Sequence, residues 1–182
     1  MKRLLLGSLF VAMTSGAHAQ VFTGQTVNYQ YLFPELTSNY SNAANGNYLV
    51  GPGVEFSNIV DGYGTMDFHD SGFLVSFTNG TSFTPSTFNG FRVSDVFGTI
   101  GSFTSFVLTS NTGVAGTPVL TFDADNLYVN WQGLGFGGGD LAFSVNSVNA
   151  IPEPETYALL LAGLGLLGLA GRRRRQKALA TA

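Results

Sequence analysis

Hydrophobic and polar residues alternate in short segments through the central part of the chain, residues 20–150, and no segment there shows a convincing helical period. The clearest alternation occurs in segments 27–33, 73–77, 127–131 and 141–145. Successive side chains of a strand point to opposite faces of a sheet, so this pattern predicts strands with one buried face. Shorter segments that look like additional strands are 66–68, 91–93, 106–108 and 120–122.

Turn-forming residues separate these segments. Asn-Gly tolerates positive φ at both central positions of a two-residue hairpin, which makes it a strong turn signal. The turn signals are Asn45-Gly46, Asn79-Gly80, Asn89-Gly90, Asp61-Gly62 and the run 137–140. Short strands with frequent turns predict an all-β fold, a single antiparallel β-sandwich of the jelly-roll type over residues 20–150. We expect the phenylalanines to form its core.

The charged residues are segregated along the chain. Arg92 is the only Lys or Arg in residues 20–150 and stands against nine acids, which gives this body a net charge of −8. We expect Arg92 to pair with an acid. Such a body would repel nucleic acid, so we expect no nucleic-acid partner. The chain contains no Cys, which excludes thiol catalysis and disulfide scaffolds. The nine acids are Glu35, Glu55, Asp61, Asp67, Asp70, Asp95, Asp123, Asp125 and Asp140.

The N-terminus has the three parts of a secretory signal peptide, in order. Lys2-Arg3 supplies a positive start, residues 4–13 are apolar, and Ala17-His18-Ala19 is a small-x-small cleavage signal before Gln20. We therefore expect residues 1–19 to be removed by signal peptidase during export.

The C-terminus combines a Pro-rich hinge, an apolar segment and a basic cluster. Residues 156–171 carry no charge and are followed at once by four arginines. A helix over this segment would be about 24 Å long, at about 1.5 Å per residue. Arginine snorkelling and local thinning cover the gap to a hydrocarbon core of about 30 Å, so we predict a C-terminal transmembrane helix over residues 156–171. Arginines beside an apolar segment stay in the cytoplasm, so residues 172–177 are expected on that side and the body on the other. The residues of the hinge and cluster are Pro152, Glu153, Pro154, Arg172, Arg173, Arg174 and Arg175.

Residues 151–177 resemble the PEP-CTERM sorting tail of Gram-negative bacteria, which is also known from some ice-binding proteins. The resemblance rests on Pro152-Glu153-Pro154, the Gly/Leu-rich segment and the terminal Arg cluster, in that order. It implies recognition by an exosortase, transient insertion in the inner membrane, cleavage near the PEP triplet and transfer to the cell surface or extracellular matrix. Exported proteins of this class often accompany exopolysaccharide and biofilm production.

Part of the body, residues 87–145, resembles domains that recur among PEP-CTERM proteins of unknown biochemical role. The residues that carry this resemblance are the segments 88–91 and 120–133. It implies a β-sandwich and no activity.

Asp123, Asp125 and Asn126 form the densest polar constellation of the body. Closely spaced carboxylate and amide oxygens suit Ca²⁺, so these residues are a candidate calcium site and Ca²⁺ a candidate cofactor. The alternative is a hairpin tip between segments 120–122 and 127–129, where Asp and Asn are ordinary turn residues.

Carbohydrate chemistry has two further sets of candidates. Exposed aromatic side chains could stack on sugar rings, and the candidates are Tyr128 and the Tyr29/Tyr31 pair. Two carboxylates roughly 5–10 Å apart could hydrolyse glycosidic bonds, but with nine acids the sequence nominates no pair. Asp67 and His69 share a strand face, so a carboxylate could orient the imidazole, but we expect these residues to form a polar strand edge that leads into the Ser71-Gly72 turn, and we predict no catalytic residue.

Taken together, the sequence predicts a non-enzymatic, exported surface or matrix protein, structural or associated with exopolysaccharide. A calcium-dependent carbohydrate-binding module and a secreted glycan-active hydrolase are the alternatives.

Overall fold

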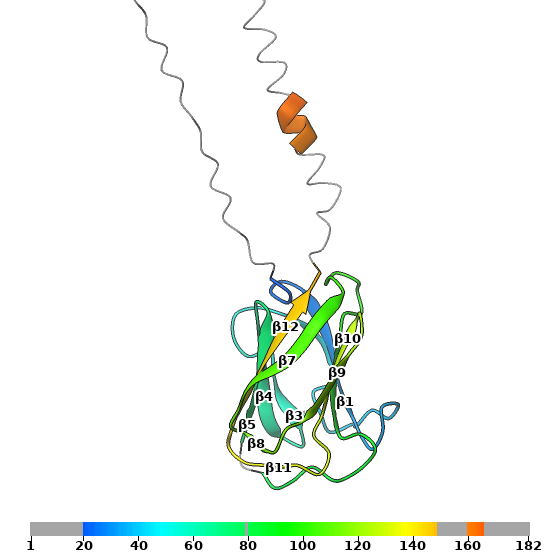
Figure 1. The fold of residues 1–182 in the computed structure, drawn as a ribbon, viewed down its shortest axis with the longest axis vertical. Helices are drawn as coiled ribbons and strands as arrows, with labels where there is room; N and C mark the ends of the chain where they lie inside the picture. Colours follow the sequence, from blue (N-terminus) through cyan, green and yellow to red (C-terminus); the bar gives the residue numbers. More distant parts are fainter. Residues whose placement is uncertain (1–19, 79, 149–159, 166–182) are drawn as a thin grey trace, which may run out of the picture.

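The computed structural model describes residues 20–78, 80–148 and 160–165. Two five-stranded antiparallel sheets pack face to face as a sandwich (Figure 1). One sheet, here sheet A, has the order β2-β1-β6-β10-β9, and the other, sheet B, has the order β3-β4-β5-β12-β7. The ten strands are β1 (Thr26–Leu32), β2 (Gly46–Leu49), β3 (Phe56–Val60), β4 (Tyr63–His69), β5 (Gly72–Phe77), β6 (Gly90–Ser94), β7 (Phe103–Asn111), β9 (Val119–Phe122), β10 (Asn126–Asn130) and β12 (Gly139–Ser147).

A small third sheet closes one end of the sandwich. It pairs β8 (Val114–Ala115) with β11 (Gly135–Phe136). The segment 81–83 joins this end, since Ser82 forms a bridge with Gly135 and the Phe83 N–H donates to the Leu134 carbonyl at 2.9 Å.

The core lies between the two sheets and is mainly aromatic. Every second residue of β1, β4, β5 and β10 is buried, which is the alternation that the sequence predicts. The phenylalanines are its main constituents, as expected. The buried phenylalanines are Phe22, Phe56, Phe68, Phe73, Phe77, Phe83, Phe88, Phe91, Phe103, Phe106 and Phe143.

The prediction of an all-β antiparallel sandwich is confirmed. The strand order does not confirm the finer prediction of a jelly-roll path. The consecutive strands β3, β4 and β5 instead form a meander within sheet B. Local pairing of neighbouring strands closes shorter loops than a path that crosses between sheets at each step.

The predicted turns have two outcomes. Asp61-Gly62 is a hairpin turn between β3 and β4, with positive φ at both residues (51° and 80°), as predicted. The prediction of a hairpin at Asn89-Gly90 is wrong, because Gly90 is the first residue of β6 and pairs with Leu32 and Asn130 on either side. Asn79 lies outside the described residues.

The described chain ends leave the sandwich at one end, and the small third sheet lies at the other. The Val21 and Phe22 N–H groups donate to the Asp70 carbonyl, and Val148 donates to Ser102. Strand β12 runs from the third sheet to this end (Figure 1). Its nine residues span about 30 Å, since a strand rises about 3.3 Å per residue.

Residues 160–165 form a short helix. In the part of the chain that the structure describes, no helix has the length and apolar character needed to cross a membrane. The rest of the predicted span 156–171, the PEP triplet and the Arg cluster lie outside the described residues, as do Ala17 and Ala19 of the predicted signal peptide.

Candidate functional site: an aromatic pocket at the end of the sandwich

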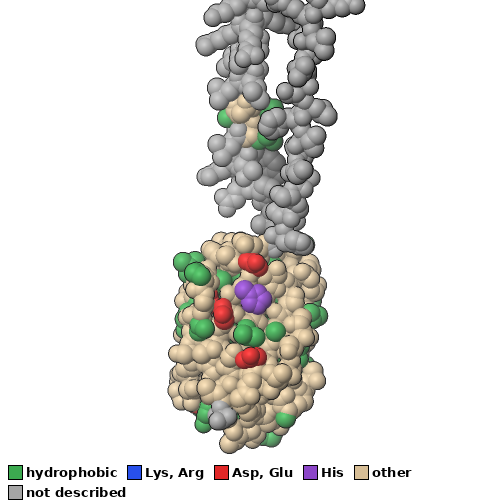
Figure 2. Space-filling model, turned by 90° about the vertical axis from the view of Figure 1, so that its left-hand side faces the viewer, with side chains coloured by type: hydrophobic (Ala, Val, Ile, Leu, Met, Phe, Trp, Pro, Cys, Tyr) green, Lys and Arg blue, Asp and Glu red, His purple; other side chains and the backbone are tan. Residues whose placement is uncertain are grey.

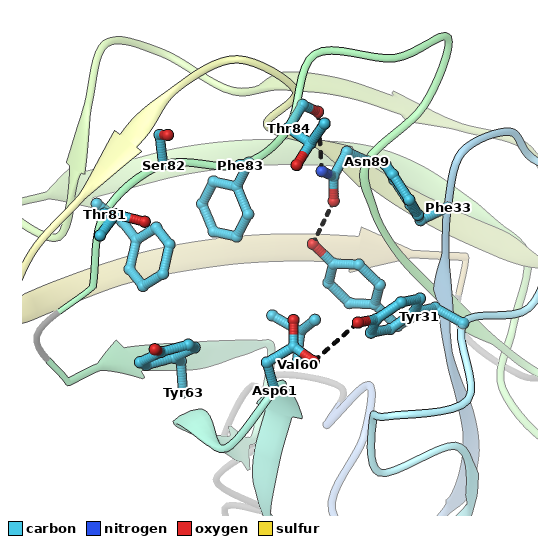
Figure 3. Close-up of a pocket in the computed structure, with 12 residues that line it drawn as sticks. Tyr31, Phe33, Val60, Asp61, Tyr63, Thr81, Ser82, Phe83, Thr84 and Asn89 are labelled. Carbon is cyan, nitrogen blue, oxygen red and sulfur yellow. Dashed lines mark hydrogen bonds between the residues drawn. The ribbon is translucent and has the colours of Figure 1, made fainter.

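A pocket of about 170 Å³ opens at the end of the sandwich that carries the third sheet. Its lower wall is the β3–β4 hairpin with Val60, Asp61 and Tyr63, and segment 81–84 lies across from it (Figure 3). Tyr31, Phe33, Tyr40, Asn89 and Phe136 complete the lining. We call this cavity the end pocket.

Asp61 supplies the carboxylate of the end pocket. Its Oδ1 accepts hydrogen bonds from the Tyr40 hydroxyl at 2.8 Å and from Asn42 Nδ2 at 2.7 Å. The left-handed backbone of the hairpin turn places this short side chain at the sandwich end. The hydrogen bond to Asp61 raises the pKa of Tyr40, with smaller contributions from burial and from the carboxylate charge. Tyr40 therefore remains a donor to Asp61 through neutral and mildly alkaline pH.

A buried hydrogen-bond chain forms the inner wall. The Trp131 indole N–H donates to the Tyr31 hydroxyl at 2.8 Å, and this hydroxyl donates to Asn89 Oδ1 at 2.6 Å. Asn89 Nδ2 in turn donates to the Thr84 carbonyl at 2.9 Å. Burial raises the pKa of Tyr31 far above its ordinary value, and Trp131 only partly offsets this. Trp131, Tyr31 and Asn89 thus each have a hydrogen-bond partner in this wall, which fixes its shape.

Aromatic rings make up most of the remaining surface. Phe83 and Phe136 stack with ring centroids 4.5 Å apart, and Tyr63 meets Phe136 edge to face at 5.4 Å. Tyr63 is 37% exposed, so part of its ring faces solvent at the pocket mouth. Rings of this kind offer apolar faces for sugar C–H groups, while Asp61 and the threonines offer polar atoms to sugar hydroxyls.

The size and charge of the end pocket restrict what it can do. Its volume lies below the range of about 300–1,000 Å³ typical of drug-sized ligands, so it suits one small unit such as a single sugar ring. Among the described residues that line it, Asp61 is the single carboxylate. Glycoside hydrolysis by a carboxylate pair needs a second acid on the other side of the glycosidic bond, so this arrangement favours binding of a sugar over its hydrolysis.

The predicted sugar platform of Tyr29 and Tyr31 needs correction. Tyr29 is 0% exposed and donates its hydroxyl to the Ile59 carbonyl at 2.9 Å, and Tyr31 is 1% exposed. Both rings face the core because they share the strand face of Val27. Neither can offer a ring face to a sugar from solvent, and Tyr31 contributes to the end pocket only as part of its inner wall.

Tyr128 lies on the outer face of sheet A and is partly exposed, because it alternates along β10 with the buried Leu127 and Val129. It stands opposite Arg92 on β6, and Arg92 stands opposite Gln30 on β1. The Arg92 guanidinium donates to Gln30 Oε1 rather than forming an ion pair among the described residues. Tyr128 is thus one ring among polar neighbours and lies away from the end pocket.

The structure places Asp123, Asp125 and Asn126 at the tip of the β9–β10 hairpin, which is the alternative to a calcium site. Asp123 Oδ1 accepts from the Asp125 N–H, the Asn126 N–H and Asn126 Nδ2, all within 2.9 Å. Partial burial acts to raise the pKa of Asp123, but these hydrogen bonds, with help from Arg92, lower it overall. No group of three or more metal-binding side chains of the His, Cys, Asp or Glu type occurs in the described ranges.

Asp67 and His69 lie on β4, and Asp70 follows at its end. Asp70 Oδ1 accepts hydrogen bonds from Gln20 Nε2 and from the Thr23 hydroxyl, both at 3.0 Å. Asp70 therefore anchors the start of the predicted mature chain. Figure 2 shows the face that carries the histidine, where acidic side chains are scattered rather than gathered in a cluster.

No motif in the sequence predicts the end pocket. The sequence predicts Asp61 as a turn residue. The aromatic residues Tyr40, Tyr63 and Phe136, which line the pocket, lie in separate segments of the sequence.

Comparison with known proteins settles the C-terminal region. Residues 150–175 match the family described as PEP-CTERM protein-sorting motif. The chain carries a PEP-CTERM sorting motif. This motif implies an exported protein that an exosortase processes and sorts to the cell surface. A search of curated proteins and of solved structures gives no match to the chain.

Proposed function

We propose that this PEP-CTERM protein is a non-catalytic surface module that associates with the exopolysaccharide of the producing cell, in a biofilm matrix, and that the end pocket is its binding site. The observation that carries this proposal is the place of the pocket. It lies at the end of the sandwich remote from Val148, about one β12 length away, and the sorting tail follows Val148 in the chain. A module held by that tail would point the pocket away from the membrane.

The proposal includes the route to the surface. Signal peptidase cleaves before Gln20, residues 156–171 hold the precursor transiently in the inner membrane, and the exosortase cleaves near Pro154. We expect the intact mass of the exported protein to correspond to a chain that begins at Gln20 and ends near Pro154. In cells without the exosortase, we expect a species that retains residues 156–182 in the membrane fraction. Retention of that tail in both strains would contradict the proposed route.

Binding is tested with the processed protein recovered from producing cells and a column of the same cells' exopolysaccharide. We expect retention that falls by roughly tenfold in affinity in Tyr63→Ala, because truncation of a central aromatic contact costs more than about 1 kcal/mol. Phe97→Ala is the matched control, since Phe97 is 57% exposed and does not line the pocket. Equal retention of all three proteins would show that the end pocket is not the glycan site.

A further inference from the structure

The end pocket combines aromatic rings with a carboxylate that keeps one oxygen available. Six of its lining residues are aromatic, and no described lining residue is Lys, Arg or His. Asp61 Oδ1 accepts two hydrogen bonds, from Tyr40 and Asn42, whereas no described residue donates to Oδ2. The side chain is exposed, so Oδ2 can meet a ligand without breaking the contacts that hold the carboxylate in place.

The charge around the pocket has one sign. The body carries nine acids against Arg92, and Arg92 is engaged with Gln30 on the outer face of sheet A. The summed field of such a body attracts cations and repels anions. A uronic-acid or phosphate group would therefore be disfavoured at the end pocket, and a neutral sugar would gain nothing from the field.

Aromatic faces and a carboxylate act together on a cation. An ammonium group is attracted to ring faces within about 6 Å by the ring quadrupole, and a charge-assisted hydrogen bond to a carboxylate is roughly twice as strong as a neutral one. We propose that the end pocket recognises the free ammonium group of an amino-sugar unit, with Asp61 Oδ2 as its acceptor and Tyr63 and Phe136 against the sugar ring. This inference rests on the proposed function and specifies its ligand class.

Asp61→Asn tests the inference with little risk to the fold. Asparagine keeps an Oδ1 acceptor for Tyr40 and Asn42, and it tolerates the left-handed backbone of this position. Asp125→Asn is the matched control, because it removes the same charge at the β9–β10 hairpin. The hydrogen bonds of Asp125 there come from its backbone N–H and carbonyl, which the substitution keeps. The probes are glucosamine oligomers, N-acetylglucosamine oligomers, glucose oligomers and choline, titrated into the processed protein in mildly acidic buffer.

We expect glucosamine oligomers to bind at least tenfold more tightly than their N-acetylated and glucose counterparts, which is about 1.4 kcal/mol. Asp61→Asn should remove this preference and Asp125→Asn should keep it, and added salt should reduce it. Equal binding of all three oligomers, unchanged in Asp61→Asn, would overturn the inference and leave the proposed function standing. Binding of choline alone would also overturn it, and so would absence of binding to every oligomer, whereas only the exopolysaccharide column decides the proposed function.

Discussion

Trp131→Ala is expected to reduce the free energy of unfolding by about 3–5 kcal/mol, the usual cost of emptying a large core site. Trp131 is 0% exposed and is among the largest fully buried side chains of the described chain. Its ring stacks on Phe83 at 4.8 Å and meets Phe77 and Phe91 edge to face, each at 5.2 Å. These contacts join both sheets to segment 81–84, so alanine would leave a cavity where three parts of the molecule meet.

The polar end of the indole adds to this cost. The Trp131 N–H is the donor to the Tyr31 hydroxyl, which in turn donates to Asn89. A buried acceptor that loses its donor costs about 1–3 kcal/mol. Trp131→Phe keeps much of the ring packing but removes this N–H, so we expect it to fall between the wild type and Trp131→Ala.

Thermal unfolding followed by circular dichroism measures both effects. For a domain of this size we expect Trp131→Ala to lower the Tm by roughly 10–20 °C. Phe97→Ala is the surface control and should change it little, because Phe97 lies 57% exposed. A Tm of Trp131→Ala within the range of Phe97→Ala would contradict the central place of Trp131 in the core.

Alternation in the sequence predicted the strands whose side chains face the core, and it missed those that lack this alternation. Strand β2 has no fully buried residue, so nothing selects hydrophobic residues at every second position. Strand β3 contains a register shift and a positive φ of 68° at Asn58, which breaks the two-residue period. Strands β8 and β11 have two residues each, too few for any period.

The end pocket could not be predicted in the same way, because it depends on which loops meet at one end of the sandwich. Tyr40 and Asp61 are 21 residues apart and Tyr31 and Trp131 are 100 residues apart, yet each pair is joined by a hydrogen bond. Such contacts follow from the strand order, which the local pattern does not encode. The error at Tyr29 and Tyr31 has a different cause: both residues share the strand face of Val27, and the structure buries that face in the core.

Asn89-Gly90 illustrates how one local pattern can have two physical causes. In a hairpin turn, glycine is selected because it tolerates positive φ. At Gly90 the cause is space: a Cβ built there would lie 1.8 Å from the Val129 carbonyl oxygen and 3.0 Å from the Asn130 Cα. Both atoms belong to the backbone of β10, so no side chain can move aside to make room.

Gly90→Ala is therefore expected to destabilise the domain by about 3 kcal/mol or more, at or beyond the usual upper range for overpacking. The added methyl would have to push β10 away from β6 in the middle of sheet A, where Leu127, Val129 and Trp131 carry the core. Gly137→Ala is the matched control, because a Cβ there meets no atom within 4 Å and its φ is not positive. We expect urea unfolding to give a much lower midpoint for Gly90→Ala, with Gly137→Ala within about 0.5 kcal/mol of the wild type. Similar midpoints for the two variants would mean that β6 and β10 can move apart without loss of stability, and that the nearby β10 backbone does not require glycine at position 90.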